Sequence, residues 1–224
     1  MIDRYKRLAP LSGVVFVALM VTVFFLPSPP DTNASGVKVI AFYRHHHTAI
    51  YVAAAVLGFA GAALTLYLAS VADFLRRSGS TLLATTTVIG AGIAAAGMFL
   101  GAGAVVAVND GPQNFTPDVA RSLNVVQSDL FWPMALGGLA IATLSMGVAM
   151  LRTRALPKAL GIITTIVGVV GCSVVASWFA FLASGPLTLV IAGYIYQRLG
   201  TPTQITMPDV PVQASAESPA QVKA

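Results

Sequence analysis

The sequence predicts an all-α fold, a polytopic transmembrane helix bundle with six spans and both termini in the cytoplasm. Three observations support this prediction. Hydrophobic residues make up 56% of the chain and charged residues only 9%, against about 25% charged in a typical soluble domain. Several apolar runs reach the roughly 20 residues needed to cross a bilayer core of about 30 Å. The charged residues lie in short clusters between these runs, as membrane topology requires.

The six spans are expected at about 8–26, 48–72, 82–108, 131–151, 159–177 and 179–197. Pro27, Pro29 and Pro30 end the first, because proline cannot continue a helix. No small-x-small cleavage site follows closely, so we interpret this run as a retained span rather than a signal peptide. The last apolar stretch is too long for one crossing at about 1.5 Å per residue. It is expected to turn near Ala176 to Phe179.

The basic residues predict the orientation of the chain in the membrane. With six spans, ten lysines and arginines fall on the inner side and three on the outer side, which indicates cytoplasmic termini in a plasma membrane. Residues 1–200 form the predicted membrane domain. The stretch 201–224 is rich in Pro, Ala, Ser and Gln without periodicity and is expected to be a disordered cytoplasmic tail. The inner ten are Arg4, Lys6, Arg7, Arg76, Arg77, Arg152, Arg154, Lys158, Arg198 and Lys223, and the outer three are Lys38, Arg44 and Arg121.

The outer loop before the fourth span carries the signals of a short amphipathic helix. Thr116 suits an N-cap, and Pro117 suits the first helical position. Apolar residues then recur at helical spacing, which predicts a helix that lies on the outer surface and leads into the fourth span. These apolar residues are Val119, Leu123, Val126 and Leu130.

The outer loop before the second span, "ASGVKVIAFYRHHH", has a similar pattern. Val37, Ile40 or Ala41, and Tyr43 or Arg44 are spaced as on one helix face. Two structures fit this pattern: a second surface helix, or an extension of the second span above the bilayer.

Three consecutive histidines, His45, His46 and His47, end that loop. Adjacent side chains on a helix point about 100° apart, so three in a row cannot converge on one ion, whereas helical metal pairs favour H-x-x-x-H spacing. Tyr43 and Tyr51 stand four residues before and after His47, and this Tyr-His-Tyr stripe favours an interfacial aromatic anchor. The alternative is an outer metal or pH-sensing site completed by another segment, with Asp129 as the partner.

Ionisable side chains near the middle of a span would mark an ion or substrate path, and the predicted spans have none there. Asp73, at the inner end of the second span, is explained by local pairing with Arg76 or Arg77. On the outer side, Arg44, Arg121 and Asp129 form a possible polar cluster.

The sequence contains no catalytic signature. It has no H-E-x-x-H, no G-x-S-x-G and no phosphate-binding glycine loop, and the hydroxyls within the spans have no base at their depth. Such hydroxyls are expected to bond to their own backbone or to a neighbouring helix. The single cysteine, Cys172, lies in an apolar run, where a packing role is expected. We therefore expect neither enzymatic activity nor a cofactor, and the clustered charges argue against nucleic acid as a partner.

Small residues recur along the third and fifth spans. Close backbone approach between membrane helices requires such residues, so these two spans are predicted to be tightly packed and central. A pore lining and self-association are the alternatives. The packing residues are Gly90, Ala94, Gly97, Gly101 and Ala104 in the third span, and Gly161, Thr165, Gly168 and Cys172 in the fifth.

Four segments, "RLAPLSGVVF", "AFYRHHH", "ARSLNVVQSDLFWP" and "RTRALPKALG", are distributed over most of residues 1–198. Through them the chain resembles a set of uncharacterised six-span integral membrane proteins of high-GC Gram-positive bacteria, the actinobacteria. The resemblance implies the six-span topology and a bacterial plasma membrane. It implies no activity.

These observations predict a non-enzymatic structural or accessory component of the plasma membrane. Its outer helices are expected to contact lipid headgroups, another membrane protein or a second copy of the chain. The alternative is a small carrier or channel for a neutral or weakly polar solute, which would use the hydroxyls and glycines of the third and fifth spans. A continuous path between those helices would favour the alternative, and a close-packed interface would disfavour it.

Overall fold

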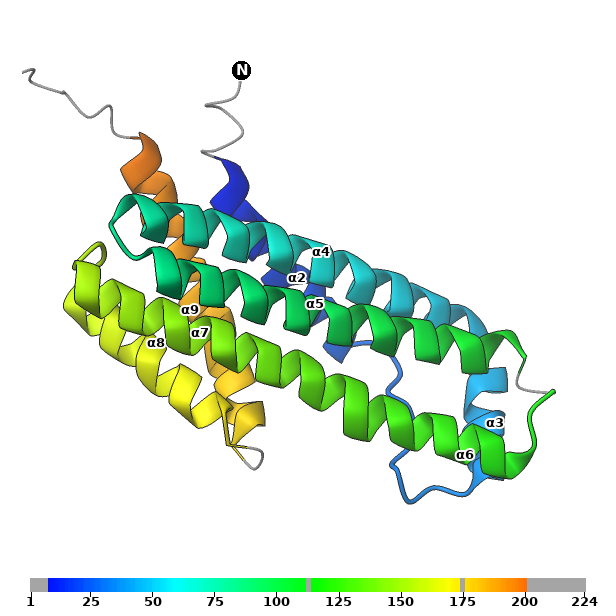
Figure 1. Ribbon diagram of the computed structural model, residues 1–224. Coiled ribbons are helices and arrows are strands. Elements are labelled where there is room, and N and C mark those ends of the chain that lie inside the picture. The colour runs from blue at the N-terminus through cyan, green and yellow to red at the C-terminus, as the bar shows by residue number, and fades with distance from the viewer. Residues whose placement is uncertain (1–7, 112–113, 174–175, 201–224) are drawn as a thin grey trace, which may run out of the picture.

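A computed structural model describes residues 8–111, 114–173 and 176–200, and the elements in these ranges are all helices (Figure 1). The predicted all-α class is therefore confirmed for the described chain. The predicted disordered tail, 201–224, lies outside the described residues. The elements are η1 (Ala9–Leu11), α2 (Ser12–Phe24), α3 (Gly36–His45), α4 (His47–Arg77), α5 (Thr81–Asp110), α6 (Pro117–Val126), the π-helix η2 (Gln127–Phe131), α7 (Trp132–Thr153), α8 (Lys158–Gly171) and α9 (Ser177–Gly200).

Four helices of the described chain are long and apolar enough to cross a membrane. They are His47–Arg77, Thr81–Asp110, Pro117–Thr153 and Ser177–Leu199. Two further apolar helices, Ala9–Phe24 and Lys158–Gly171, are shorter than the other four. The chain is thus a helix bundle of membrane character in which four of the predicted spans have the expected length.

The fifth predicted span, 159–177, is too long at its C-terminal end. Helix α8 ends at Gly171 and a turn begins at Cys172; beyond it the N–H of Ala176 donates to Ser173 Oγ at 3.1 Å. The turn therefore precedes the predicted position at Ala176 to Phe179, and α9 has already begun at Ser177. At about 1.5 Å per residue, the 14 residues of α8 extend only about 21 Å.

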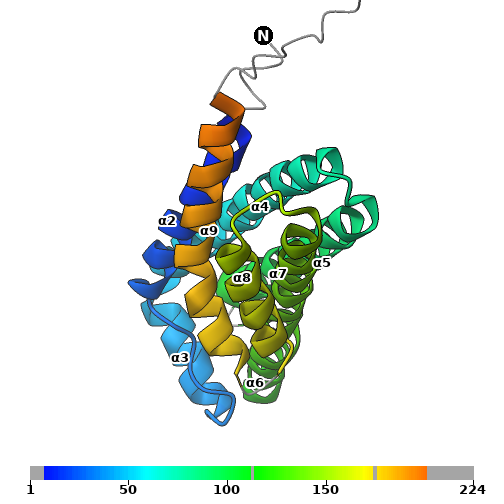
Figure 2. The same cartoon turned by 90° about the vertical axis from the view of Figure 1, so that its left-hand side faces the viewer.

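Helix α7 is the centre of the bundle. It packs along α5 on one side and along α8 on the other, and α5 in turn packs against α4 (Figure 1). Helices α2 and α9 lie side by side and cover α4 and the open side of α7 (Figure 2). The main hydrophobic core forms where these layers meet, with the buried Leu64, Met98 and Ile191 among its members.

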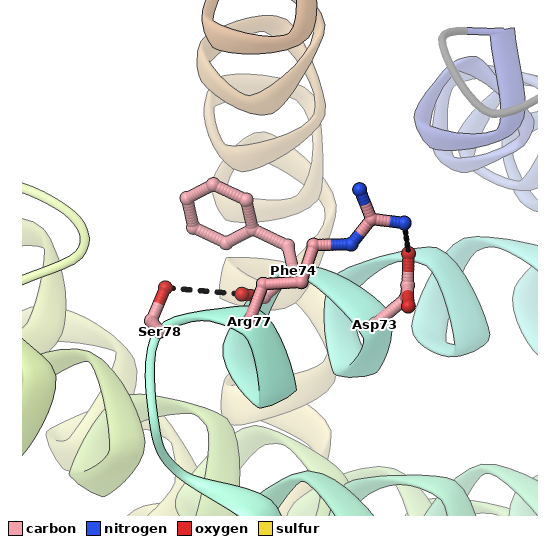
Figure 3. Close-up of polar contacts among 4 residues, drawn as sticks. All are labelled: Asp73, Phe74, Arg77 and Ser78. Carbon is pink, nitrogen blue, oxygen red and sulfur yellow. Dashed lines mark hydrogen bonds and ion pairs between the residues drawn. The ribbon is translucent and has the colours of Figure 1, made fainter. Parts of the chain in front are cut away.

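The turn between α4 and α5 shows how the basic end of the bundle is built. Asp73 and Arg77, one helical turn apart, form an ion pair at 2.5 Å, and Ser78 Oγ donates to the carbonyl oxygen of Phe74 at 3.0 Å (Figure 3). The sequence predicted this local pairing of Asp73. Gly79 then adopts φ +91°, a conformation that costs glycine little, and α5 begins two residues later.

Candidate functional site: the helical cap and the cavity beneath it

Helices α3 and α6 form a small cap at the end of the molecule opposite the α4–α5 turn (Figure 1). They bury a second hydrophobic core, separate from the main one, between themselves and the adjoining ends of α4 and α5. The polar stretch between α2 and α4 is therefore partly a folded element and not an irregular loop. The fully packed members of this core are Val39, Tyr43, Ile50, Val105, Val108 and Ala120.

Local sequence determines where both cap helices begin. The N–H of Lys38 donates to Ser35 Oγ at 3.4 Å, and the N–H of Val119 donates to Thr116 Oγ1 at 3.5 Å, so each helix has a side-chain N-cap. The two helix starts then meet, because a Cβ on Gly36 would collide with the backbone of Pro117. Thr116 caps the helix and Pro117 occupies its first turn, as the sequence predicts.

The prediction that α6 leads into the fourth predicted span is confirmed, but its predicted direction is wrong. The helix does not lie across the end of the bundle; it continues through the π-helix η2 into α7, and together they form one helix of 37 residues, Pro117–Thr153 (Figure 1). Its buried residues are Ala120 and Asn124, whereas the predicted apolar stripe is largely exposed, with Leu130 56% accessible. Because α6 continues the direction of α7, it buries small side chains against its neighbour α3, and its large apolar residues face outward.

The loop before the second predicted span forms a helix of its own. Helix α3 ends at His45, and His46, at φ −107° and ψ 22°, separates it from α4. Its buried face is Gly36, Val39 and Tyr43, so the predicted stripe is shifted in part, and Val37 is exposed.

Long-range hydrogen bonds connect segments at this end of the molecule, one of them between α6 and the linker after α2 and the others between α4 and α5. Asn124 Nδ2 donates to the carbonyl oxygen of Pro30 at 3.0 Å, and Asn109 Nδ2 donates to that of His47 at 3.0 Å. Both asparagines are buried, and each donated bond satisfies the amide nitrogen while the amide oxygen has no hydrogen-bond partner among the described residues. Tyr51 Oη donates to Asp110, which connects the first turns of α4 to the end of α5.

Tyr43 connects the cap to the π-helix. Its ring is fully buried in the second core, and its hydroxyl donates to Gln127 Oε1 at 3.4 Å. Burial raises the pKa of the Tyr43 phenol to about 12, because the phenolate would lose its hydration there. The hydroxyl is therefore a donor at any physiological pH.

The three histidines do not form a metal site within the described residues. His45 and His47 are exposed and His46 is half-buried, and no group of His, Cys, Asp or Glu side chains in the described chain could hold an ion. The predicted Tyr-His-Tyr stripe is broken by the helix end at His46. His47 still stacks edge-on against Tyr51, with ring centroids 5.0 Å apart, while Tyr43 faces the opposite way, into the core.

The predicted outer polar cluster has no ion pair. Arg44, Arg121 and Asp129 are all exposed, and the one ion pair among the described residues is Asp73–Arg77 at the other end. The three side chains lie on three separate elements, α3, α6 and η2.

The small residues of the third predicted span pack against α7. A Cβ on Gly90 would lie 2.6 Å from the backbone nitrogen of Ala142, and one on Gly97 would lie 2.5 Å from that of Ala135. Ala94 faces Gly138, whose added Cβ would collide with the Ala94 backbone. Gly101 differs, since its added Cβ would meet only Phe131 Cβ, at 3.7 Å.

The small residues of the fifth predicted span also pack against α7, and not against the third span. A Cβ on Gly168 would lie 2.5 Å from the Leu144 backbone, and one on Gly161 would lie 2.9 Å from the Leu151 side chain. The central helix is thus the fourth span, which sequence reasoning missed. Its spacing carried the signal: Ala135, Gly138, Ala142, Ser145 and Ala149 recur at helical intervals.

The hydroxyls of the bundle behave as the sequence predicts. Thr87 and Ser145 share a buried hydrogen bond of 3.0 Å between α5 and α7, and Thr143 donates to the carbonyl oxygen of Leu139 at 2.8 Å. Cys172 differs from its predicted packing role, because it lies just past the end of α8 and is exposed.

Beneath the cap lies a partly open cavity of about 300 Å³. Sequence reasoning did not predict it, because its wall comes from α2, the linker after it, α4, α5, η2, α7 and α9. Most of the lining is apolar. The polar side chains in it are Ser28, Gln127, Ser128 and the indoles of Trp132 and Trp178, and no charged side chain lines it.

No known family, curated protein or solved structure matches this chain. The resemblance to six-span actinobacterial proteins thus stays a prediction, and the site must be interpreted from its own geometry. That geometry offers a folded cap at one end of the bundle and an uncharged cavity beneath it.

Proposed function

We propose that this chain is a six-span protein of a bacterial plasma membrane that acts as a non-enzymatic structural or accessory component. Its outer cap would be the part that meets a partner. The observation that supports this most strongly is the second hydrophobic core. A loop that only joins two spans has no need of its own core and two capped helices.

The chain direction supports six crossings. Successive apolar helices alternate in direction between the cap end and the basic end, and the two short ones, α2 with η1 and α8, occupy the first and fifth places. A bilayer can thin locally around a short span at modest cost. The basic side chains at the α4–α5 turn, at the α7–α8 connection and at the end of α9 support a cytoplasmic position for that end. They are Arg76, Arg77, Arg152, Arg154, Lys158 and Arg198.

The outward face of the cap has the composition of a contact surface. It carries exposed apolar side chains, of which Val37 is 65% accessible, next to the exposed Lys38, Arg44 and Arg121. Neighbouring apolar and basic groups fit the boundary between a membrane and a protein partner, or anionic headgroups.

The alternative function, a carrier or channel, required a path along the third and fifth spans. Those helices approach α7 so closely that Gly90 and Gly168 leave no room for one added carbon. A solute path along those interfaces would need the helices to separate, and the close packing therefore favours the accessory role.

The test is isolation of the full chain from its native membrane in a mild detergent. We expect a protein or headgroup partner at a fixed ratio, and we expect its loss from the variant Lys38→Gln/Arg44→Gln/Arg121→Gln. Asp118→Asn, which removes another exposed charge from the cap, is the matched control and should keep the partner. Recovery of the wild-type protein alone, as a single folded species, would contradict the proposal.

A further inference from the structure

The cavity beneath the cap is too large to be a packing defect. A buried water needs about 10–15 Å³ of such space, and ligand sites begin at about 300 Å³. The cavity volume is about 300 Å³. Its deep walls are apolar, with Met20 from α2 and Leu57 from α4 among them.

Two features of the helices keep this space open. Gly97 holds α5 against α7, but one turn later the added Cβ of Gly101 would meet only Phe131 Cβ, at 3.7 Å, and would otherwise point into the cavity. At the same level the chain entering α7 is a π-helix, which is wider than an α-helix and occurs often at functional sites. The two helices therefore separate where the cavity begins.

The π-helix also supplies the polar groups of the cavity. Tyr43 occupies Gln127 Oε1 as a donor, so the amide nitrogen of Gln127 is left to donate toward a ligand, next to the Ser128 hydroxyl. No Lys, Arg, His, Asp or Glu lines the space. A ligand that fits would present an uncharged acceptor at this end and hydrocarbon elsewhere.

An aromatic cluster closes one side. Trp178 stacks on Phe181 with ring centroids 5.5 Å apart, and Trp132 lies 5.9 Å from Phe181 and 6.1 Å from Trp178. Phe24, at the end of α2, contacts Trp178 edge-on at 6.1 Å. Trp132 and Trp178, which both line the cavity, are the two tryptophans of the chain.

We propose that this cavity binds one acyl chain of a membrane phospholipid, with the ester carbonyl accepting from Gln127 and Ser128. The cavity is partly open and lies in the outer half of a bundle of membrane character, where acyl chains are the surrounding solvent. Its uncharged lining matches an ester and not a free carboxylate. This inference does not depend on the partner proposed for the cap.

The two tryptophans allow a direct test by fluorescence quenching. The variant Trp178→Phe leaves the half-buried Trp132 as the single tryptophan, which is excited selectively at about 295 nm. The purified full chain in a non-quenching detergent is titrated with phosphatidylcholine carrying 9,10-dibromostearoyl chains, and separately with 9,10-dibromostearate. We expect saturable quenching by the phospholipid, reversed by unlabelled dioleoylphosphatidylcholine, and at least tenfold weaker binding of the carboxylate.

Variants that fill the cavity must remove the saturable part. Gly101→Leu fills it from α5 and Ala53→Phe fills it from α4, so a folding failure of one leaves the other. Gly103→Leu and Ala55→Phe, on exposed positions of the same helices, are the matched controls and should bind as before. Linear, unsaturable quenching, saturation by the free acid alone, or full binding in folded, cavity-filled variants would each overturn the proposal.

Discussion

Two adjacent glycines on α7 have opposite surroundings. A Cβ on Gly138 would collide with the backbone of Ala94 on α5, whereas a Cβ on Gly137 would meet nothing within 4 Å. Gly138 therefore determines how closely α5 and α7 approach, and Gly137 does not. The pair separates the effect of helix packing from the general effect of replacing glycine.

We predict that Gly138→Ala destabilises the bundle by about 1–3 kcal/mol, the usual cost of overpacking a core. Gly137→Ala should leave stability unchanged or raise it slightly, since alanine is the better helix former. Unfolding by sodium dodecyl sulfate in mixed micelles, followed by circular dichroism, measures both. Equal effects of the two substitutions would show that α5 and α7 are not in backbone contact.

The burial of Tyr43 leads us to predict that the stability of the cap depends on pH. Its phenol pKa is raised from 10.0 to about 12 by burial, so the neutral form is favoured in the folded state. The stabilisation is complete below pH 10 and is lost as the pH rises through the folded pKa of about 12. At about 1.4 kcal/mol per pKa unit, the loss is roughly 2–3 kcal/mol.

The comparison is between wild-type protein and Tyr43→Phe, which has no proton to lose at this position. Between pH 9 and pH 12, the melting temperature should fall more steeply with pH in the wild type than in Tyr43→Phe. Absorbance of phenolate near 295 nm should show one late-titrating tyrosine fewer in the variant. Parallel stability profiles would indicate that Tyr43 is accessible to water.

At the scale of elements, local signals predicted helix starts well. Thr116 caps α6 as predicted, and Ser35, which was not singled out from the sequence, caps α3 in the same way; such caps depend only on residues three positions apart. The direction in which a helix then extends depends on distant partners. The stripe that includes Val119 and Leu130 predicted a surface helix. The contact of Gly36 with Pro117 and the continuity through η2 instead keep α6 in line with α7.

The helix-packing pattern was predictable in part for the same reason. A small-residue stripe shows that a helix face is tightly packed, but it does not say against which neighbour. The sequence therefore indicated close packing for Gly90 and Gly168 but could not reveal that both contact α7. The cavity was beyond prediction, because Trp132 and Trp178 meet only when α7 and α9 are placed together.

The π-helix yields a prediction about a whole element. Each hydrogen-bonded π-turn holds one residue more than an α-turn, so η2 accommodates an extra residue between α6 and α7. Deleting the exposed Leu130 should let the segment close into a regular α-helix with both flanks in register. We expect the variant to fold, with a melting temperature within a few degrees of wild type.

Deleting the exposed Ile141, inside the regular part of α7, is the matched control. It rotates every following residue by about 100° and moves Ser145 and Ala149 off the packing face, so the bundle should fail to form. Yield and monodispersity in detergent measure both outcomes. If the Leu130 deletion is as damaging as the Ile141 deletion, the register of α6 depends on η2 as it stands.

At the scale of the whole molecule, the chain has two centres of packing with different chemistry. The main core depends on backbone contact between glycine- and alanine-rich helices, and the cap depends on side-chain burial and on the Asn124–Pro30 hydrogen bond. The cap is at one end and the clustered basic residues are at the other. This polarity makes the orientation in the membrane the property on which the proposed function depends.

The orientation can be tested with single cysteines in a Cys172→Ser background. Ser122→Cys places a thiol on the exposed face of α6, and Thr81→Cys places one at the exposed start of α5. A membrane-impermeant maleimide added to intact cells should label the first and not the second, and permeabilised cells should show labelling of both. The positive-inside distribution requires this result, because Arg76 and Arg77 lie next to the α5 start. Labelling of Thr81→Cys alone in intact cells would show the opposite orientation, with the cap in the cytoplasm. That result would contradict the proposed contact with an outer partner.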